Sequence, residues 1–265
     1  MFFMKLGITS LIYHKRSFLD CLKDVAEIGY NYIEPNFVTG YYGHYNALEL
    51  EKSPKQLAAI VQALCDSHLA CSGVDCHGLC QGNMEKVEYT IRYVSAGIHV
   101  AKALCCPILI TSYPCGEASW SKIVDATIQL ANEAKALGIL YAVEPERRYP
   151  VSNSKNLRQL INDVGDNLVK VNFDPTHFID EGEDPIKALH NFIPELVHVH
   201  LKDYIDGKPA PFLGQKGSPA YRLLKELQRL DFQGVVSAET LADVCDEPER
   251  LARDIYAAIQ HTLAE

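Results

Sequence analysis

The sequence lacks the segments that would tie a protein to a membrane or direct it out of the cell. It holds no uncharged apolar stretch of about 20 residues, the length needed to span a bilayer. Residues 1–15 offer only broken apolar runs, without the long apolar region and small-residue cleavage site of a signal peptide. We therefore expect a soluble protein of the cytoplasm.

Basic side chains are scarce. The chain has 25 Lys and Arg against 34 Asp and Glu, a formal net charge of −9. Nucleic acids and anionic membranes attract clustered Lys and Arg, so this balance argues against both as partners. A small molecule is the better expectation, and a homo-oligomer is compatible with the sequence.

Paired cysteine motifs are missing as well. The nine cysteines are scattered, and none forms the C-x-x-C pair of a zinc ribbon or a redox motif. We expect most of them to be buried small hydrophobic residues in a reducing compartment.

Linkers and low-complexity segments are also missing, so residues 1–265 are expected to form a single domain. Short apolar runs alternate with longer helical patterns, which is typical of βα repeats around a parallel sheet. The predicted strands are Lys5–Thr9, Tyr30–Glu34, Leu69–Asp75, Pro107–Thr111, Leu140–Glu144, Val169–Asp174, Leu196–Leu201 and Val235–Glu239. Eight such units predict an α/β fold, a (β/α)8 TIM barrel.

Helix starts between these strands carry recognisable signals. Ser53-Pro54, Asp184-Pro185 and Ser218-Pro219 each place a side-chain oxygen at the N-cap and a proline in the first turn. Ser17 begins a pattern that resembles a capping box, and Gly29 ends the same helix. The apolar faces of these helices should cover the outside of the barrel.

The longest stretches without a helix or strand pattern are Pro35–Lys52 and Tyr204–Gly217. Both follow predicted strands, so both are expected as irregular segments on the carboxyl-terminal face. Barrel enzymes build their sites on that face.

Four predicted strands in succession end in a residue that can bind a metal. These residues are Glu144, Asp174, His200 and Glu239, at spacings of 30, 26 and 39 residues. Because each spacing is close to one βα repeat, neighbouring strands would bring all four to one rim. Three carboxylates and an imidazole suit one divalent ion among Mn²⁺, Mg²⁺, Co²⁺ and Zn²⁺.

Each of these residues taken alone has a simpler reading. An acidic residue at a strand end often caps the following helix or faces solvent. Four together would repel one another in a confined site unless a cation lay between them. The set therefore favours a metal site over separate caps.

Successive side chains of a strand point to opposite faces, and this period shows which residues near the four candidates would point into the barrel. His198, His200 and Lys202 share the inward face of the seventh predicted strand. We interpret His198 as a hydrogen-bonded core histidine. Lys202 lies nearer the mouth, where it would bind a substrate oxygen or balance the acidic cluster.

Three further residues are candidates for the substrate pocket. His177 lies three residues past Asp174, where a turn would bring it back over the metal. Glu34 ends the second predicted strand and His77 follows the third, so both would line the opposite wall. Helix capping is the alternative role for His177, and ion pairing is the alternative for Glu34 and His77.

With these residues in place, the sequence resembles the xylose-isomerase-like TIM barrels, a family of sugar phosphate isomerases and epimerases. The resemblance covers essentially the whole chain. Its carriers are Tyr32-Ile33-Glu34, Ala142-Val143-Glu144-Pro145, Asn172-Phe173-Asp174-Pro175-Thr176-His177, His198-Val199-His200-Leu201-Lys202-Asp203 and Ala238-Glu239.

The resemblance implies a metal-dependent isomerase or epimerase of a sugar or polyol. It implies that Glu144 and Glu239 bind the metal and exchange a proton with the substrate through an enediolate. It also implies that His177 contacts substrate oxygens. The chemistry is reasonable, because a metal that polarises a carbonyl stabilises the enediolate formed when a carboxylate takes the α-proton.

One departure from the family pattern matters. Ketose 3-epimerases of this family carry an arginine about six residues past the histidine that matches His200, and this chain has Asp206 there. The substrate is then a ketose held by Lys202 or Lys208, or else a cyclitol, a keto acid or another polyol derivative.

Three other functions are weighed against this one. A lyase, such as an inosose or dehydroshikimate dehydratase, would use the same enediolate to expel a β-hydroxyl group. An AP endonuclease would need a histidine-rich trinuclear zinc site and a positive DNA-binding face, which the charge of −9 disfavours. A non-catalytic sugar-binding protein is the third alternative.

Overall fold

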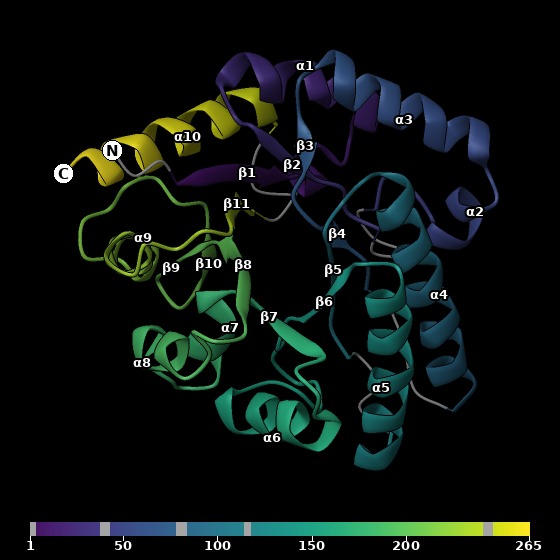
Figure 1. Cartoon of the computed structure of the whole chain (residues 1–265). Coiled ribbons are helices and arrows are strands. Elements are labelled where there is room, and N and C mark those ends of the chain that lie inside the picture. Colours follow the sequence, from purple (N-terminus) through teal and green to yellow (C-terminus); the bar gives the residue numbers. More distant parts are fainter. Residues whose placement is uncertain (1–3, 38–42, 78–83, 114–117, 241–245) are drawn as a thin grey trace.

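A computed structural model of the chain shows a ring of parallel strands surrounded by helices (Figure 1). The structure describes residues 4–37, 43–77, 84–113, 118–240 and 246–265. The barrel strands are β1 (Lys5–Thr9), β2 (Tyr32–Glu34), β3 (Ala70–Cys71), β4 (Val74–Asp75), β5 (Ile108–Thr111), β6 (Leu140–Val143), β7 (Val169–Phe173), β8 (Leu196–Leu201) and β11 (Val235–Ala238).

The sheet runs in the order β3-β2-β1-β11-β8-β7-β6-β5-β4, and its two ends are consecutive along the chain. Strands β3 and β4 together occupy the third position of the barrel, so the predicted (β/α)8 barrel is confirmed. The prediction of one unbroken strand at Leu69–Asp75 is wrong, because Ser72 and Gly73 interrupt it. A Cβ at Gly73 would lie 2.8 Å from Ile110 Cδ1, so a larger residue there would require the Ile110 side chain to shift.

Helices cover the outside of this ring (Figure 1). They are α1 (Phe18–Ile28), α2 (Ala47–Glu51), α3 (Pro54–Asp66), α4 (Met84–Ala103), α5 (Trp120–Ala136), α6 (Ser154–Val164), α7 (Pro175–Asp180), α8 (Pro185–His190), α9 (Pro219–Arg229) and α10 (Pro248–Ala264), with a 3-10 turn at Ser10–Tyr13. Among the helices in the described part of the chain, none has the length and apolar character needed to cross a bilayer.

The helix ends follow the sequence signals. Ser17 accepts a hydrogen bond from the backbone of Asp20, and Gly29 ends α1 with a φ of 111°. Asp184 and Ser218 cap α8 and α9 through their side chains. Ser53 stands at the N-cap of α3 but makes no side-chain cap.

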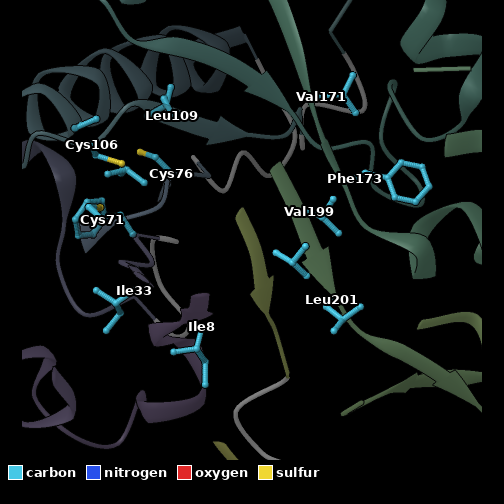
Figure 2. Packing of buried hydrophobic residues seen from close by; sticks show 14 of the residues in the cluster. Ile8, Ile33, Cys71, Cys76, Cys106, Leu109, Val171, Phe173, Val199 and Leu201 are labelled. Carbon is cyan, nitrogen blue, oxygen red and sulfur yellow. The ribbon is translucent and has the colours of Figure 1, made fainter. Parts of the chain in front are cut away.

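The main core lies between the sheet and the helices (Figure 2). On β8, Val199 and Leu201 belong to this core, while His198 and His200 alternate with them and point into the barrel. Of the six cysteines in the described ranges, four are buried, in agreement with the expectation for this residue type.

Two segments expected to be irregular contain secondary structure. Helix α2 lies within Pro35–Lys52, and a hairpin of β9 (Asp203–Ile205) and β10 (Lys208–Ala210) begins one residue before Tyr204–Gly217 and continues into it. The hairpin turns at Asp206 and Gly207, whose φ angles are 52° and 77°. An Asp-Gly pair is favoured in such a two-residue turn, so this signal was present in the sequence and was overlooked.

Candidate metal centre

The four residues expected to bind a metal lie together at the carboxyl-terminal mouth of the barrel. Glu144, Asp174 and Glu239 directly follow β6, β7 and β11, and His200 lies near the end of β8. Each offers one ligand atom, and these atoms lie within 4.8 Å of one another. All four side chains are buried.

The strand ladder fixes two of these residues. The backbone N–H of Glu144 donates to Thr111 O at 2.9 Å, and that of Glu239 donates to Leu201 O at 3.1 Å. Both bonds continue the parallel pairing by one residue beyond the strand end. The two carboxylates therefore start from backbone positions that the sheet itself determines.

Asp174 combines the two roles weighed for it in the sequence. Its Oδ1 caps α7 by accepting from Thr176 N at 2.8 Å and Thr176 Oγ1 at 2.7 Å. Its Oδ2 faces the other way and lies 2.7 Å from Lys202 Nζ. One carboxylate thus holds the helix with one oxygen and presents the second to the site.

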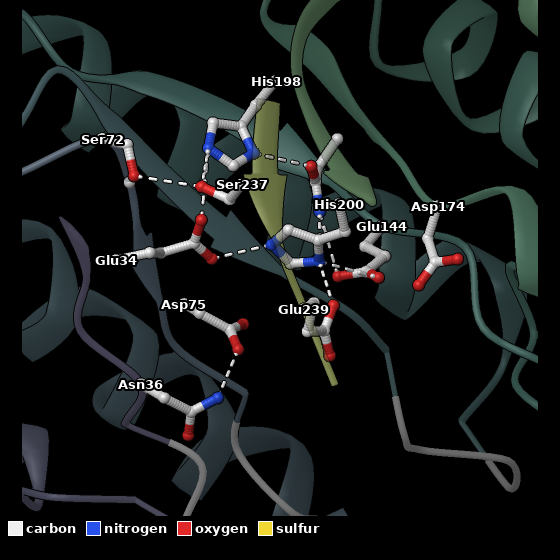
Figure 3. A network of polar contacts seen from close by, with 12 residues as sticks. Glu34, Asn36, Ser72, Asp75, Glu144, Asp174, His198, His200, Ser237 and Glu239 are labelled. Carbon is white, nitrogen blue, oxygen red and sulfur yellow. Dashed lines mark hydrogen bonds and ion pairs between the residues drawn. The ribbon is translucent and has the colours of Figure 1, made fainter. Parts of the chain in front are cut away.

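His200 stands between carboxylates on both sides of its ring (Figure 3). Its Nε2 lies 2.7 Å from Glu34 Oε1. Its Nδ1 lies 2.8 Å from Glu239 Oε2 and 3.2 Å from Glu144 Oε1. The Nδ1 atom therefore faces the other candidate ligands.

Opposite charges keep these groups ionised despite their burial. Burial opposes charge on Glu144, but His200 and His177 outweigh it and hold the pKa of this carboxyl well below its usual range. Burial likewise opposes charge on Glu239, whose pKa Lys202 and His200 lower to about 2. Burial lowers the pKa of His200, but Glu144, Glu34 and Glu239 raise it well above its usual value.

The donor set fits a divalent metal. Asp174 Oδ2 lies 2.7 Å from Lys202 Nζ, and Glu239 Oε2 lies 2.8 Å from His200 Nδ1, so both buried oxygens already face cationic groups. Buried carboxylates need such compensation, and a divalent metal placed among them would supply it as well. Carboxylate oxygens with one imidazole suit Mn²⁺, Mg²⁺, Co²⁺ or Zn²⁺.

Lys202 lies inside the cluster. Its Nζ is 2.7 Å from Asp174 Oδ2 and 3.0 Å from Glu239 Oε1. Burial disfavours its charge, but Asp174 and Glu239 raise its pKa well above the usual value. Lys202 thus balances charge in this structure, and one face of the cluster carries a fixed cation.

His177 lies in the first turn of α7 and reaches back over the cluster. Its Nε2 is 3.3 Å from Glu144 Oε1 and 3.6 Å from Asp174 Oδ2, and its side chain is 18% exposed. Burial opposes charge on the ring, but Asp174 and Glu144 raise its pKa to about 9. It is more exposed than any of the four candidate ligands.

His77 forms the opposite wall with residues that the sequence reasoning had not grouped with it. Its Nε2 pairs with Asp75 Oδ1 and lies 3.9 Å from Glu144 Oε2. Its Nδ1 lies 2.9 Å from Glu146 Oε1 and 2.7 Å from Ser112 Oγ. The wall therefore adjoins the metal candidates through Glu144.

Asp75 is the acidic member of this wall that sequence reasoning treated only as a strand end. Asn36 Nδ2 donates to its Oδ2 at 2.6 Å. Asp75 is buried, and burial raises the pKa of its carboxyl to about 6 against the lowering effect of His77. Asp75 lies opposite Ile110 in the pairing of β4 with β5. This register cannot be read from the sequence, so the inward direction of the Asp75 side chain was not predicted.

Glu34 lies behind His200 and is fully buried. One oxygen faces His200, and the other lies 3.2 Å from His198 Nε2. His198 also contacts Asn172, at 2.9 Å between Nδ1 and Oδ1. This hydrogen-bonded, buried position agrees with the interpretation of His198 as a core histidine.

Asn172 was missed by sequence reasoning. It connects His198 to Glu144, donating from Nδ2 to Glu144 Oε2 at 3.1 Å. The signal was available, since Asn172 precedes Asp174 by two residues and so shares its face of the strand.

Comparison with known proteins places this geometry in a family. A family model described as the xylose isomerase-like TIM barrel matches residues 22–260. The chain belongs to this family. The resemblance stated from the sequence motifs is thereby confirmed.

Relatives of this xylose isomerase-like barrel with curated names include inosose dehydratases. The one from Bacillus thuringiensis (strain Al Hakam) is 29% identical over 87 residues, 33% of this chain and 29% of the relative. One from Clostridium perfringens (strain 13 / Type A) is 28% identical over 97 residues, 37% of this chain and 33% of the relative. The matched segment thus spans about a third of either relative.

Solved structures show the same fold over the whole chain. A D-psicose 3-epimerase matches with a TM-score of 0.76 and 18% identity, covering 99% of this chain and 100% of that one. The IOLI protein with a binding zinc atom matches with a TM-score of 0.73 and 20% identity, covering 98% and 96%.

Proposed function

We propose that this xylose isomerase-like barrel is a divalent-metal-dependent isomerase or epimerase of a sugar or polyol. Glu144, Asp174, His200 and Glu239 would hold the metal. The observation that carries the proposal is the convergence of these four buried side chains, with Glu144 and Glu239 oxygens on either side of His200 Nδ1.

The two glutamates are assigned the proton transfer. Each is held as a carboxylate by neighbouring cations, which is the form that a base requires, while the lowered pKa makes each a weaker base as long as those cations contact it. They follow β6 and β11, with β7 and β8 between them in the sheet, and so approach a bound molecule from different sides. Two bases on different sides permit inversion at carbon, whereas one base used twice gives isomerisation.

A bound metal would polarise the carbonyl and the adjacent hydroxyl of the substrate, which acidifies the α-proton. His177, Lys202 and His77 are proposed to contact substrate oxygens. His177 and His77 border Glu144 from two sides, at 3.3 Å and 3.9 Å. Glu34 was a fourth substrate-binding candidate, but it lies behind His200 and a different role is proposed for it below.

A dehydratase is the second candidate, and the named relatives favour it. Two curated proteins that each match about a third of this chain are inosose dehydratases. The same carboxylates would remove the α-proton, and loss of a β-hydroxyl group as water would follow. A keto-cyclitol is the substrate class that this alternative predicts.

Turnover in D₂O separates the two. The metal-loaded protein is incubated with a panel of ketoses and one keto-cyclitol, and the products are followed by NMR and mass spectrometry. An epimerase or isomerase places deuterium on the carbon next to the carbonyl, while a dehydratase gives an unsaturated product and water. Product without deuterium uptake and without water loss would contradict proton transfer by these glutamates.

A further inference from the structure

Two of the candidate metal ligands, His200 and Glu144, belong to a closed ring of polar contacts among five buried side chains (Figure 3). Each is 3% exposed or less. The members, in order around the ring, are Glu34, His200, Glu144, Asn172 and His198. Successive contacts measure 2.7, 3.2, 3.1, 2.9 and 3.2 Å, the last returning from His198 to Glu34.

The orientation of Asn172 follows from its neighbour. Glu144 as a carboxylate only accepts hydrogen bonds, so the amide nitrogen of Asn172 must face it. The amide oxygen is then directed to His198, which donates from Nδ1. Hydrogen-bond donation therefore runs from His198 to Asn172 and from Asn172 to Glu144.

The two nitrogens of His200 have different neighbours. Glu34 Oε1 is a buried acceptor 2.7 Å from Nε2, so Nε2 carries a hydrogen and donates it. An imidazole binds a metal through a nitrogen that carries no hydrogen. Nδ1 faces the candidate ligands Glu144 and Glu239, so it is the nitrogen that would exchange its hydrogen for a metal.

We infer that Glu34 is a positioning residue that makes Nδ1 of His200 the metal-binding atom, an inference that rests on the proposed metal site. Its carboxylate fixes the hydrogen on Nε2 and sets the rotation of the ring. Asn172 acts beside it by holding Glu144 Oε2, which leaves Oε1 on the side of His200. Partners of this kind change metal affinity by about 10- to 100-fold when they are removed.

The first test replaces Glu34 by glutamine. Glu34→Gln keeps the size of the side chain but loses the charge, so its carbonyl oxygen is a weaker acceptor for Nε2–H. The dissociation constant for Mn²⁺, measured by calorimetric titration of the folded protein, should rise about 10- to 100-fold. The absorption spectrum of the Co²⁺ form should shift as well, which a purely structural role would not produce.

Glu183→Gln is the matched control. It makes the same replacement at a glutamate that accepts a hydrogen bond from Ser154 N and contacts no member of the ring. Its affinity for Mn²⁺ should stay within about threefold of the wild type, a change of under 1 kcal/mol. Equal affinity in Glu34→Gln and the wild type would overturn the inference.

The second test needs no variant of Glu34. In protein labelled with ¹⁵N-histidine and loaded with ¹¹³Cd²⁺, the coupling to cadmium should appear at Nδ1 of His200, with a hydrogen detected on Nε2. The His200→Asn variant assigns the signals. Coupling through Nε2 would overturn the inference while leaving the metal site standing, whereas a wild type that binds no divalent metal would overturn the proposed function too.

Discussion

Strands β6, β7, β8 and β11 differ from β2, β3, β4 and β5 in length and in what they carry. The first group has 4, 5, 6 and 4 residues and provides all four candidate ligands. The second group has 3, 2, 2 and 4 residues, with an interruption at Ser72 and Gly73.

The two groups also use different means to place side chains. In the first, a ladder that continues past the strand end places Glu144 and Glu239. In the second, His77 lies beyond β4 and is held by contacts from Glu146 and Ser112 on other segments. Changes in the first half should therefore alter metal binding and chemistry, and changes at His77 should alter substrate handling.

The largest effect on stability is expected from Lys202→Met in the metal-free protein. The variant leaves Asp174 and Glu239 buried without their cation, and breaking such a pair costs about 3–5 kcal/mol. Saturating Mn²⁺ should restore part of this loss by supplying the missing positive charge. Urea unfolding with and without Mn²⁺ measures the loss of stability and its recovery. A loss of stability that Mn²⁺ does not reduce would contradict the placement of Lys202 within the metal site.

Glu144→Gln and Glu239→Gln should each lower kcat by about 100-fold or more, the usual scale for losing a general acid or base. Metal content is determined in each variant, because both residues are also candidate ligands. Glu183→Gln serves as the control, since Glu183 accepts from Ser154 N outside the site. Near-normal turnover by a metal-loaded glutamine variant would exclude that glutamate from the chemistry.

Asp174→Asn should weaken metal binding without loss of the helix cap. Asparagine keeps an oxygen for Thr176 N but removes the charge that faces Lys202. Metal at about 100 times its dissociation constant adds about 2.7 kcal/mol of stability, so the rise of Tm with Mn²⁺ should shrink in the variant. Asp184→Asn, a change at the cap of α8, should leave that rise unchanged.

The smallest effects are expected at two residues proposed to contact the substrate, His77 and His177. His77→Asn and His177→Ala should each raise KM or lower kcat by about 10-fold, corresponding to one hydrogen bond to substrate of about 1.5 kcal/mol. Metal content should stay near that of the wild type. Loss of metal in His77→Asn would contradict the distinction between strands β6, β7, β8 and β11, which place the candidate ligands, and the segment after β4, which places His77.

Sequence reasoning reached the fold and the four strand-end residues for a physical reason. Barrel strands such as β8 alternate core and interior positions, and their spacing along the chain brings the ends to one rim. These regularities depend only on local periodicity, which the sequence carries directly.

The residues around His77 and the ring that contains His200 depend on contacts between segments that are far apart in the sequence. The inward direction of Asp75 follows from its pairing with Ile110, and the approach of Glu146 to His77 follows from the path of a loop. Neither is encoded in the spacing of residues within one segment.

The pairing of β1 with β11 governs the order in which the site is assembled. Lys5 lies opposite Val235, and β11 enters the sheet between β1 and β8. Contacts between residues so far apart in the chain form late, because a long loop must be closed first. During translation Glu144, Asp174 and His200 leave the ribosome before Glu239, so a nascent chain holds three of the four metal candidates while its sheet is still open. The complete set of four candidate ligands therefore exists only in a chain whose last strand, β11, has paired with β1 and β8.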